Sequence, residues 1–154
     1  MPSLQALLGS APRRQLVIGD AVKVLDAEVA SKGGLTGIAI KGAYAVVKGI
    51  SPSFIQETID HLLNDFLDAL DPLYQEAVAS NSSPQSHVAS NRSRMAEALL
   101  AITDRRAVGA RPALKKTYEK LRPLAKGQVE AAAPRVGELL ERHTRAAAAA
   151  GAAG

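Results

Sequence analysis

The chain has 154 residues, a formal net charge of +4, no cysteine and only 3% aromatic residues. This length fits one domain with its own core, and the lack of cysteine excludes disulfides, thiolate metal sites and cysteine nucleophiles. Because tryptophan is absent, leucine, valine, isoleucine and alanine must build the core, which suits closely packed helices. We predict an all-α fold, a single compact domain of five to seven helices in an irregular bundle interrupted by prolines.

Charge is segregated along the chain. Residues 1–50 carry six basic and three acidic side chains, residues 51–90 carry six acids and no lysine or arginine, and residues 91–154 carry thirteen basic and six acidic side chains. Regions of opposite sign attract each other. We therefore expect the acidic region to pair with the basic C-terminal segment and to leave a surplus of cations.

The N-terminal third lacks the order of a secretory signal, because the apolar Leu4, Leu7 and Leu8 precede Arg13 and Arg14. The most apolar stretch, residues 33–50, carries two lysines and five glycines and is short for a membrane-spanning helix, which needs about 20 mostly apolar residues. We expect a soluble protein of the cytoplasm.

Residues 13–31 and 36–48 are the first two predicted helices, since apolar residues recur on one side of the first and Ser31-Lys32-Gly33-Gly34 ends it. In the second, Gly42, Ala45 and Gly49 lie along the side that carries its lysines. Glycine in a helix interior costs about 1 kcal/mol relative to alanine. We therefore expect another backbone to pack closely against these small residues.

The third predicted helix follows Ser51 or Ser53 as cap and has a broad apolar face that runs to Leu70. Asp71-Pro72 should kink or restart this helix, because a residue before proline is disfavoured in the helical region. The predicted core consists of thirteen apolar side chains from the whole chain: Val24, Leu25, Ile40, Val47, Ile59, Leu62, Leu63, Phe66, Leu70, Leu99, Leu100, Leu121 and Leu140.

The opposite face of the third helix places His61 and Asp65 one turn apart, with Asp68 one turn further on. A histidine and two carboxylates on one face could ligate a divalent metal. The alternative, which we favour, is a solvated face that pairs with the basic segment. We predict no metal site, and these three residues are the one candidate.

Residues 80–93 are almost wholly polar and form a predicted loop or polar helix that could act as a hinge. A further helix is expected over 94–104. We assign residues 1–146 to one helical domain and residues 147–154, which are all alanine or glycine, to a disordered tail.

Prolines 112, 123 and 134 recur every eleven residues and align one apolar stripe through the C-terminal segment. An 11-residue period matches about 3.67 residues per turn, which keeps a stripe nearly straight. Since proline starts helices and breaks their interiors, we expect two or three short helices, bent before Pro123 and Pro134.

Four runs of the sequence together resemble a family of small actinobacterial proteins that is classed only as a domain of unknown function. They are EVASKGGLTGIAIKGAYAVVKGI, FLDALDPLYQEA, ALLAITDRRA and TYEKLRPLAKGQVEAAAPRVGELLERH. The resemblance covers nearly the full chain. It implies a compact helical domain in a bacterial cytoplasm and no assigned activity.

The sequence has no G-x-S-x-G turn, no P-loop and no G-x-G-x-x-G, so we predict no enzymatic activity and no cofactor. We expect an interaction or scaffold module with a protein partner or self-association. The alternatives are an anionic lipid or polymer surface bound by the proline-spaced amphipathic segments, and nucleic acid bound by the basic half. The candidate partner-binding residues are Arg105, Arg106, Arg111, Lys115, Lys116, Lys120 and Arg122.

Overall fold

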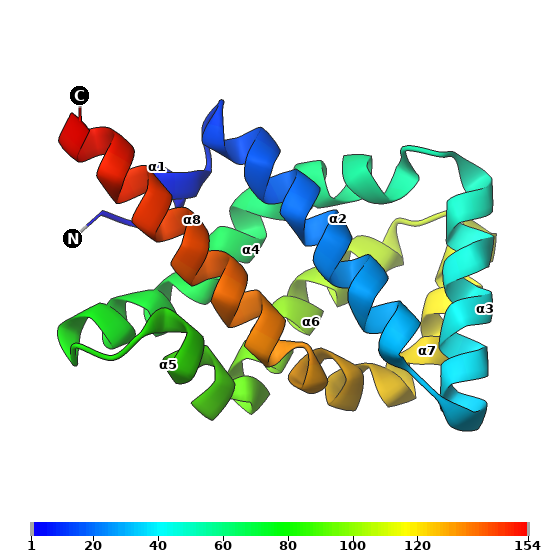
Figure 1. Ribbon diagram of the computed structural model, residues 1–154. Helices are drawn as coiled ribbons and strands as arrows, with labels where there is room; N and C mark the ends of the chain where they lie inside the picture. Colours follow the sequence, from blue (N-terminus) through cyan, green and yellow to red (C-terminus); the bar gives the residue numbers. More distant parts are fainter. Residues whose placement is uncertain (1, 154) are drawn as a thin grey trace.

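The computed structural model describes residues 2–153, which form eight helices and no strand in a single compact domain (Figure 1). The helices are α1 (Leu4–Leu8), α2 (Arg13–Ser31), α3 (Gly34–Ile50), α4 (Phe54–Ala79), α5 (Pro84–Ser90), α6 (Arg92–Val108), α7 (Pro112–Ala131) and α8 (Ala133–Ala153). The all-α prediction is confirmed. The prediction of five to seven helices is wrong, because there are eight. Helix α1 was not predicted, and the segment of α5 was predicted as either a loop or a polar helix.

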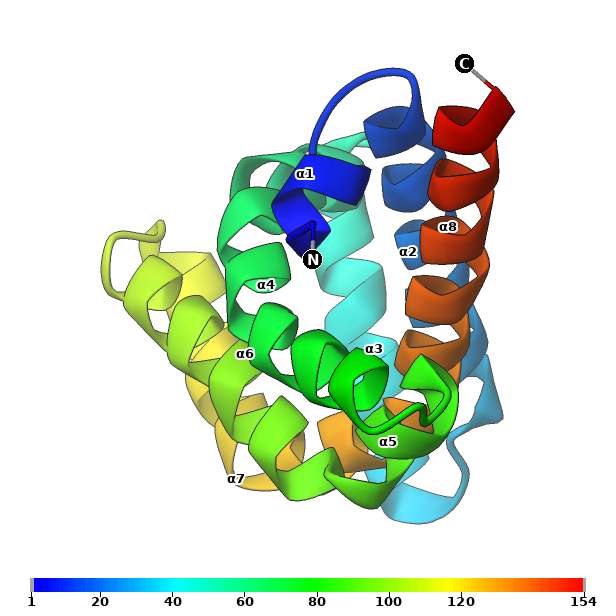
Figure 2. The ribbon, with the colours of Figure 1, turned by 90° about the vertical axis from the view of Figure 1, so that its left-hand side faces the viewer.

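Helices α2 and α8 lie side by side across one face of the molecule, and α4 passes behind them (Figures 1 and 2). Helices α1 and α5 fill the space between α4 and α8. Within residues 2–153, no helix is long and apolar enough to cross a membrane.

The core is assembled mainly by α1, α2, α4, α5, α6 and α8. Of the predicted core, Leu62, Leu63, Leu70, Leu100 and Leu140 are buried. Leu25 is exposed, contrary to the prediction. The buried apolar residues that the prediction missed are Leu4, Leu8, Val17, Ile18, Leu67, Leu73, Ala77, Val88, Met95, Ala96, Ile102, Ala133 and Leu139. Leu4 and Leu8 belong to α1 and Val88 belongs to α5, two helices that are too short to show a periodic apolar pattern.

Helix α4 continues without interruption through Pro72 for 26 residues, so the predicted restart does not occur. Leu70 and Leu73 are both buried on either side of the proline, and their burial offsets the lost backbone hydrogen bond. Asp71 does not restart its own helix but caps the start of α1. Its Oδ1 accepts the backbone N–H of Leu4 at 2.9 Å and thereby holds the start of α1 against α4.

Helix α5 stands where the sequence predicts a polar loop or polar helix. Ser83 accepts the N–H of Ser86 as an N-cap, Pro84 occupies the first turn, and Val88 is fully buried. The helix packs mainly on α8. The two backbones meet at Gly137, where a Cβ atom would lie 2.8 Å from the Cα of Gln85.

The C-terminal stripe is confirmed as the inward side of α7 and α8, since none of its nine residues is exposed. They are Leu114, Tyr118, Leu121, Ala125, Val129, Ala132, Val136, Leu140 and His143. The chain breaks between the two helices just before Pro134, as expected. It does not break at Pro123, which lies inside α7. Helix α8 continues to Ala153, through most of the predicted tail, and Gly154 lies outside the described residues.

Candidate functional site

A group of basic side chains on the last turn of α6, the first half of α7 and their connection stands out because it lacks acidic partners. Of the nineteen lysines and arginines, all within the described residues, ten form an ion pair, which leaves nine. Six of these nine are among the seven partner-binding residues predicted from the sequence, and all six are exposed. They are called the cationic patch below: Arg105, Arg106, Arg111, Lys115, Lys116 and Lys120.

The patch follows the hairpin that α6 and α7 form. Arg105 and Arg106 lie in the last turn of α6, where cations interact favourably with the helix dipole. Arg111 lies in the connection, and the three lysines lie in the first half of α7. Unpaired acids also occur here, since Asp65 and Glu119 make no ion pair in the described part of the chain. The patch is therefore cationic but not uniformly so.

Arg105 and Arg106 border an open hollow of about 480 Å³ between α6 and α4. His61 and Asp65 of α4 line its other side, and Leu62 and Ile102 line the rest. The structure thus brings part of the predicted metal face together with part of the predicted cationic group. Guanidinium groups bind carboxylates and phosphates through paired hydrogen bonds, so the hollow suits an anionic group.

The predicted metal candidate is not assembled as a site. Within residues 2–153, no three histidine, aspartate or glutamate side chains lie close enough to hold a metal ion. Asp65 faces the hollow. Asp68 instead accepts a 2.6 Å hydrogen bond from the side-chain amide of Gln5 on α1.

Arg122, the seventh candidate, has a structural role. Its guanidinium donates two hydrogen bonds to Asp104, at 2.8 and 3.1 Å, and so connects α7 to α6. The Tyr118 hydroxyl donates to the same carboxylate. These bonds, from Arg122 first and Tyr118 second, hold the pKa of Asp104 below its ordinary value. Arg122 is thus occupied within the chain and does not belong to the patch.

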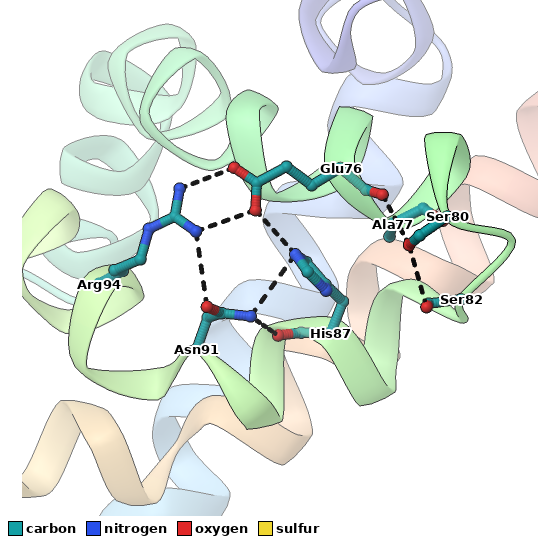
Figure 3. A network of polar contacts seen from close by, with 7 residues as sticks. All are labelled: Glu76, Ala77, Ser80, Ser82, His87, Asn91 and Arg94. Carbon is teal, nitrogen blue, oxygen red and sulfur yellow. Dashed lines mark hydrogen bonds and ion pairs between the residues drawn. The ribbon is translucent and has the colours of Figure 1, made fainter.

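A second polar network was not predicted and joins α4, α5 and α6 (Figure 3). Arg94 donates to both carboxylate oxygens of Glu76, at 2.9 and 2.8 Å, and His87 contacts Oε1 at 2.9 Å. Asn91 lies beside His87 and Arg94. The bonds from Arg94 and then His87 lower the pKa of Glu76 to about 2. Ser83-Pro84, a helix-start signal, is the sequence feature that could have revealed α5 and hence this network.

Two further networks join α2 to α8. Asp20 contacts Nε2 of His143 at 2.6 Å and accepts from Arg142 at 3.1 Å. Burial raises the pKa of Asp20, but these two partners outweigh burial and leave that pKa below its ordinary value. One turn from the end of α2, the buried Glu28 pairs with Arg135 at 2.8 Å and with Lys32 at 3.1 Å.

The expected pairing of the acidic region with the C-terminal segment is mostly wrong. Glu76 with Arg94 is the one lysine or arginine pair that links residues 51–90 to residues 91–153 among the described residues. Asp60 pairs with Arg14 on α2 instead. Arg135 and Arg142 of α8 reach acids of α2, because α8 packs beside α2. The helix arrangement, which the charge order along the chain does not reveal, decides which charges meet.

Comparison with known proteins gives one result. Searches of curated proteins and of solved structures returned no match to the chain. A family model matches residues 4–144, which includes all of α1 to α7 and the buried part of α8. The chain therefore belongs to a family of unknown function, DUF6918.

Proposed function

We propose that this protein is a non-enzymatic interaction module that binds an acidic segment of a protein partner through the cationic patch. The observation that carries the proposal is the clustering of unpaired cations. Six of the nine basic side chains without an ion pair lie between residues 105 and 120. As the resemblance implies, we place this role in a bacterial cytoplasm, with an actinobacterial origin.

Exposed cations without acidic partners bind anions because association releases small counterions and forms charge-assisted hydrogen bonds. Arg105 and Arg106 are the anchoring pair in this proposal, since both border the hollow. A carboxylate can approach them there on the protein surface while the remaining four cations of the patch contact neighbouring acids of the same partner.

The acids within the patch favour a protein partner over nucleic acid. Asp65 lines the hollow, and Glu119 lies between Lys116 and Lys120. An evenly charged phosphate backbone would be repelled by both. A protein segment with acidic and neutral or basic positions can place its own charges to suit them.

The test compares two double charge reversals. R105E/R106E removes the anchoring pair, and K23E/R145E changes two exposed cations on α2 and α8 by the same total charge. Each tagged variant is used to capture partners from native lysate after crosslinking, and the captured proteins are identified and quantified. Circular dichroism verifies that both variants remain folded.

We expect an acidic partner whose recovery falls about tenfold with R105E/R106E, falls with rising salt and is unchanged with K23E/R145E. Equal recovery with both variants would show that the patch does not select the partner. A DNA or RNA oligonucleotide that binds the wild-type chain in a salt-dependent manner and is lost with R105E/R106E would replace this proposal with the nucleic-acid one.

A further inference from the structure

Helix α3 exposes large apolar side chains to solvent. It buries only Gly37, while Leu35, Ile38 and Val46 are 87%, 69% and 56% exposed. The helix lies at one edge of the molecule, on the right of Figure 1. An apolar face of this kind on a folded domain marks an interaction surface.

The exposed residues form one continuous face. At 100° per residue, Leu35, Ile38, Ala39, Gly42, Ala45, Val46, Gly49 and Ile50 fall within an arc of about 140°. All eight are exposed. Lys41 and Lys48 lie at one edge of this arc, where their ammonium groups can stay in water. The eight residues are called the α3 face below.

The two glycines of the α3 face do not pack against any other part of the described chain. A Cβ atom at Gly42 or at Gly49 would meet nothing within 4 Å, so the sequence-based expectation of a closely packed backbone is not met inside the described residues. Glycine in the interior of a helix is less favourable for helix stability than alanine. Two glycines in open space on an apolar face leave room for something that approaches from outside.

The α3 face is complementary to itself when a second copy is turned to run in the opposite direction. With Gly42 opposite Gly42, Leu35 of one copy lies opposite Gly49 of the other, and Ile38 lies opposite Val46. Each large end residue thus meets a glycine, and the helices can cross most closely at the two central glycines. A two-fold interface requires this kind of self-matching surface.

We infer that two copies of this protein associate through the α3 faces, with the two α3 helices antiparallel and centred on Gly42. A lipid surface fits the same face less well. The face has no aromatic residue, and its glycines and alanines offer little apolar area for insertion. Neither glycine would be needed against a fluid bilayer, whereas both are needed for close approach of a second helix.

The experiment measures molecular mass by analytical ultracentrifugation from about 1 µM to about 1 mM, because a single pair of helices makes a small interface. The test variant is Gly42→Leu, which the isolated chain can accommodate because the site is open. The matched control is Gly127→Leu on α7, which is also in open space within a helix. Circular dichroism and thermal melting verify that both variants fold.

We expect the wild-type chain and Gly127→Leu to dimerise with rising concentration, and Gly42→Leu to remain monomeric over the whole range. The dimer should not weaken with added salt, unlike binding to the cationic patch. A second pair of variants tests the register. Gly49→Leu should prevent dimerisation, and Leu35→Ala combined with Gly49→Leu should restore it, because the large and small positions are then exchanged.

A wild-type chain that stays monomeric at about 1 mM would overturn the inference. So would equal dimerisation by Gly42→Leu and the wild type. If the wild type is monomeric and Gly42→Leu binds phosphatidylglycerol vesicles more tightly than the wild type, the α3 face is a lipid-binding surface instead. Loss of dimerisation with Gly49→Leu that the double variant does not reverse would refute the antiparallel register.

Discussion

The contact between Gly137 of α8 and Gln85 of α5 gives the sharpest prediction about the fold. A methyl group at Gly137 would lie 2.8 Å from Cα and 2.9 Å from the carbonyl oxygen of Gln85. Nonbonded carbon atoms prefer about 3.5–4.0 Å. Gly137→Ala must therefore push the two helices apart by about 0.7 Å, since the atoms in its way belong to backbone and cannot rotate aside.

Two opposing effects set the size of the change. Alanine is better than glycine in a helix by about 1 kcal/mol, and overpacking of this kind costs about 1–3 kcal/mol. We expect Gly137→Ala to lower the free energy of unfolding by as much as about 2 kcal/mol. The same exchange at Gly127, where a Cβ meets nothing within 4 Å, should raise it by about 1 kcal/mol.

The assay is urea unfolding followed by circular dichroism at 222 nm, with wild type and both variants measured side by side. The difference between the two alanine variants, about 1–3 kcal/mol, is the quantity to compare, because the helix-propensity term cancels. Equal stabilisation by both substitutions would show that α5 does not touch α8 at Gly137, and the placement of residues 84–90 would then be incorrect.

Two other predictions concern stability. Because the pKa of Glu76 falls from its ordinary 4.5 to about 2 on folding, its pairing with Arg94 contributes stability that is present above pH 4.5 and is lost as the pH falls towards 2. Glu76→Gln should therefore flatten the decline of melting temperature across that range, and an unchanged decline would contradict the network. Leu8→Ala should lower the free energy of unfolding by about 2–5 kcal/mol because Leu8 is fully buried, whereas Leu35→Ala on the exposed face should change it by less than about 0.5 kcal/mol. Similar losses at both positions, measured in urea, would show that α1 is not part of the core.

Patterns local to one helix predicted much of the secondary structure. The bounds of α2, Arg13–Ser31, match the predicted range, because its apolar side and its terminating glycines lie next to each other in sequence. The apolar faces of α4 and of the C-terminal helices were likewise visible as periodicity. In the candidate site, the same approach singled out all six cations of the patch, since a surplus of charge can be counted without a structure.

Hydrogen bonds and ion pairs between residues on different helices could not be predicted from these local patterns. Asp71 was expected to restart its own helix, and it caps α1 instead, 67 residues away. Arg122 was grouped with the cations of the patch, but it is held by Asp104 on α6. The sequence did not decide between a loop and a helix for the segment of α5, because a seven-residue helix with one buried valine, Val88, is too short for a periodic pattern and depends on the packing of α8 against it.

The helical class and the apolar faces of the long helices followed from the residue pattern, since each depends on residues within a few turns of one another. The surplus of positive charge followed from counting residues. The contacts of the individual small and charged residues depend instead on how the helices pack together. Gly137 and Gly42 are both glycines in the interior of a long helix. The first touches the backbone of α5, and the second faces open space, because the packing of the helices places one inside the molecule and the other on its surface.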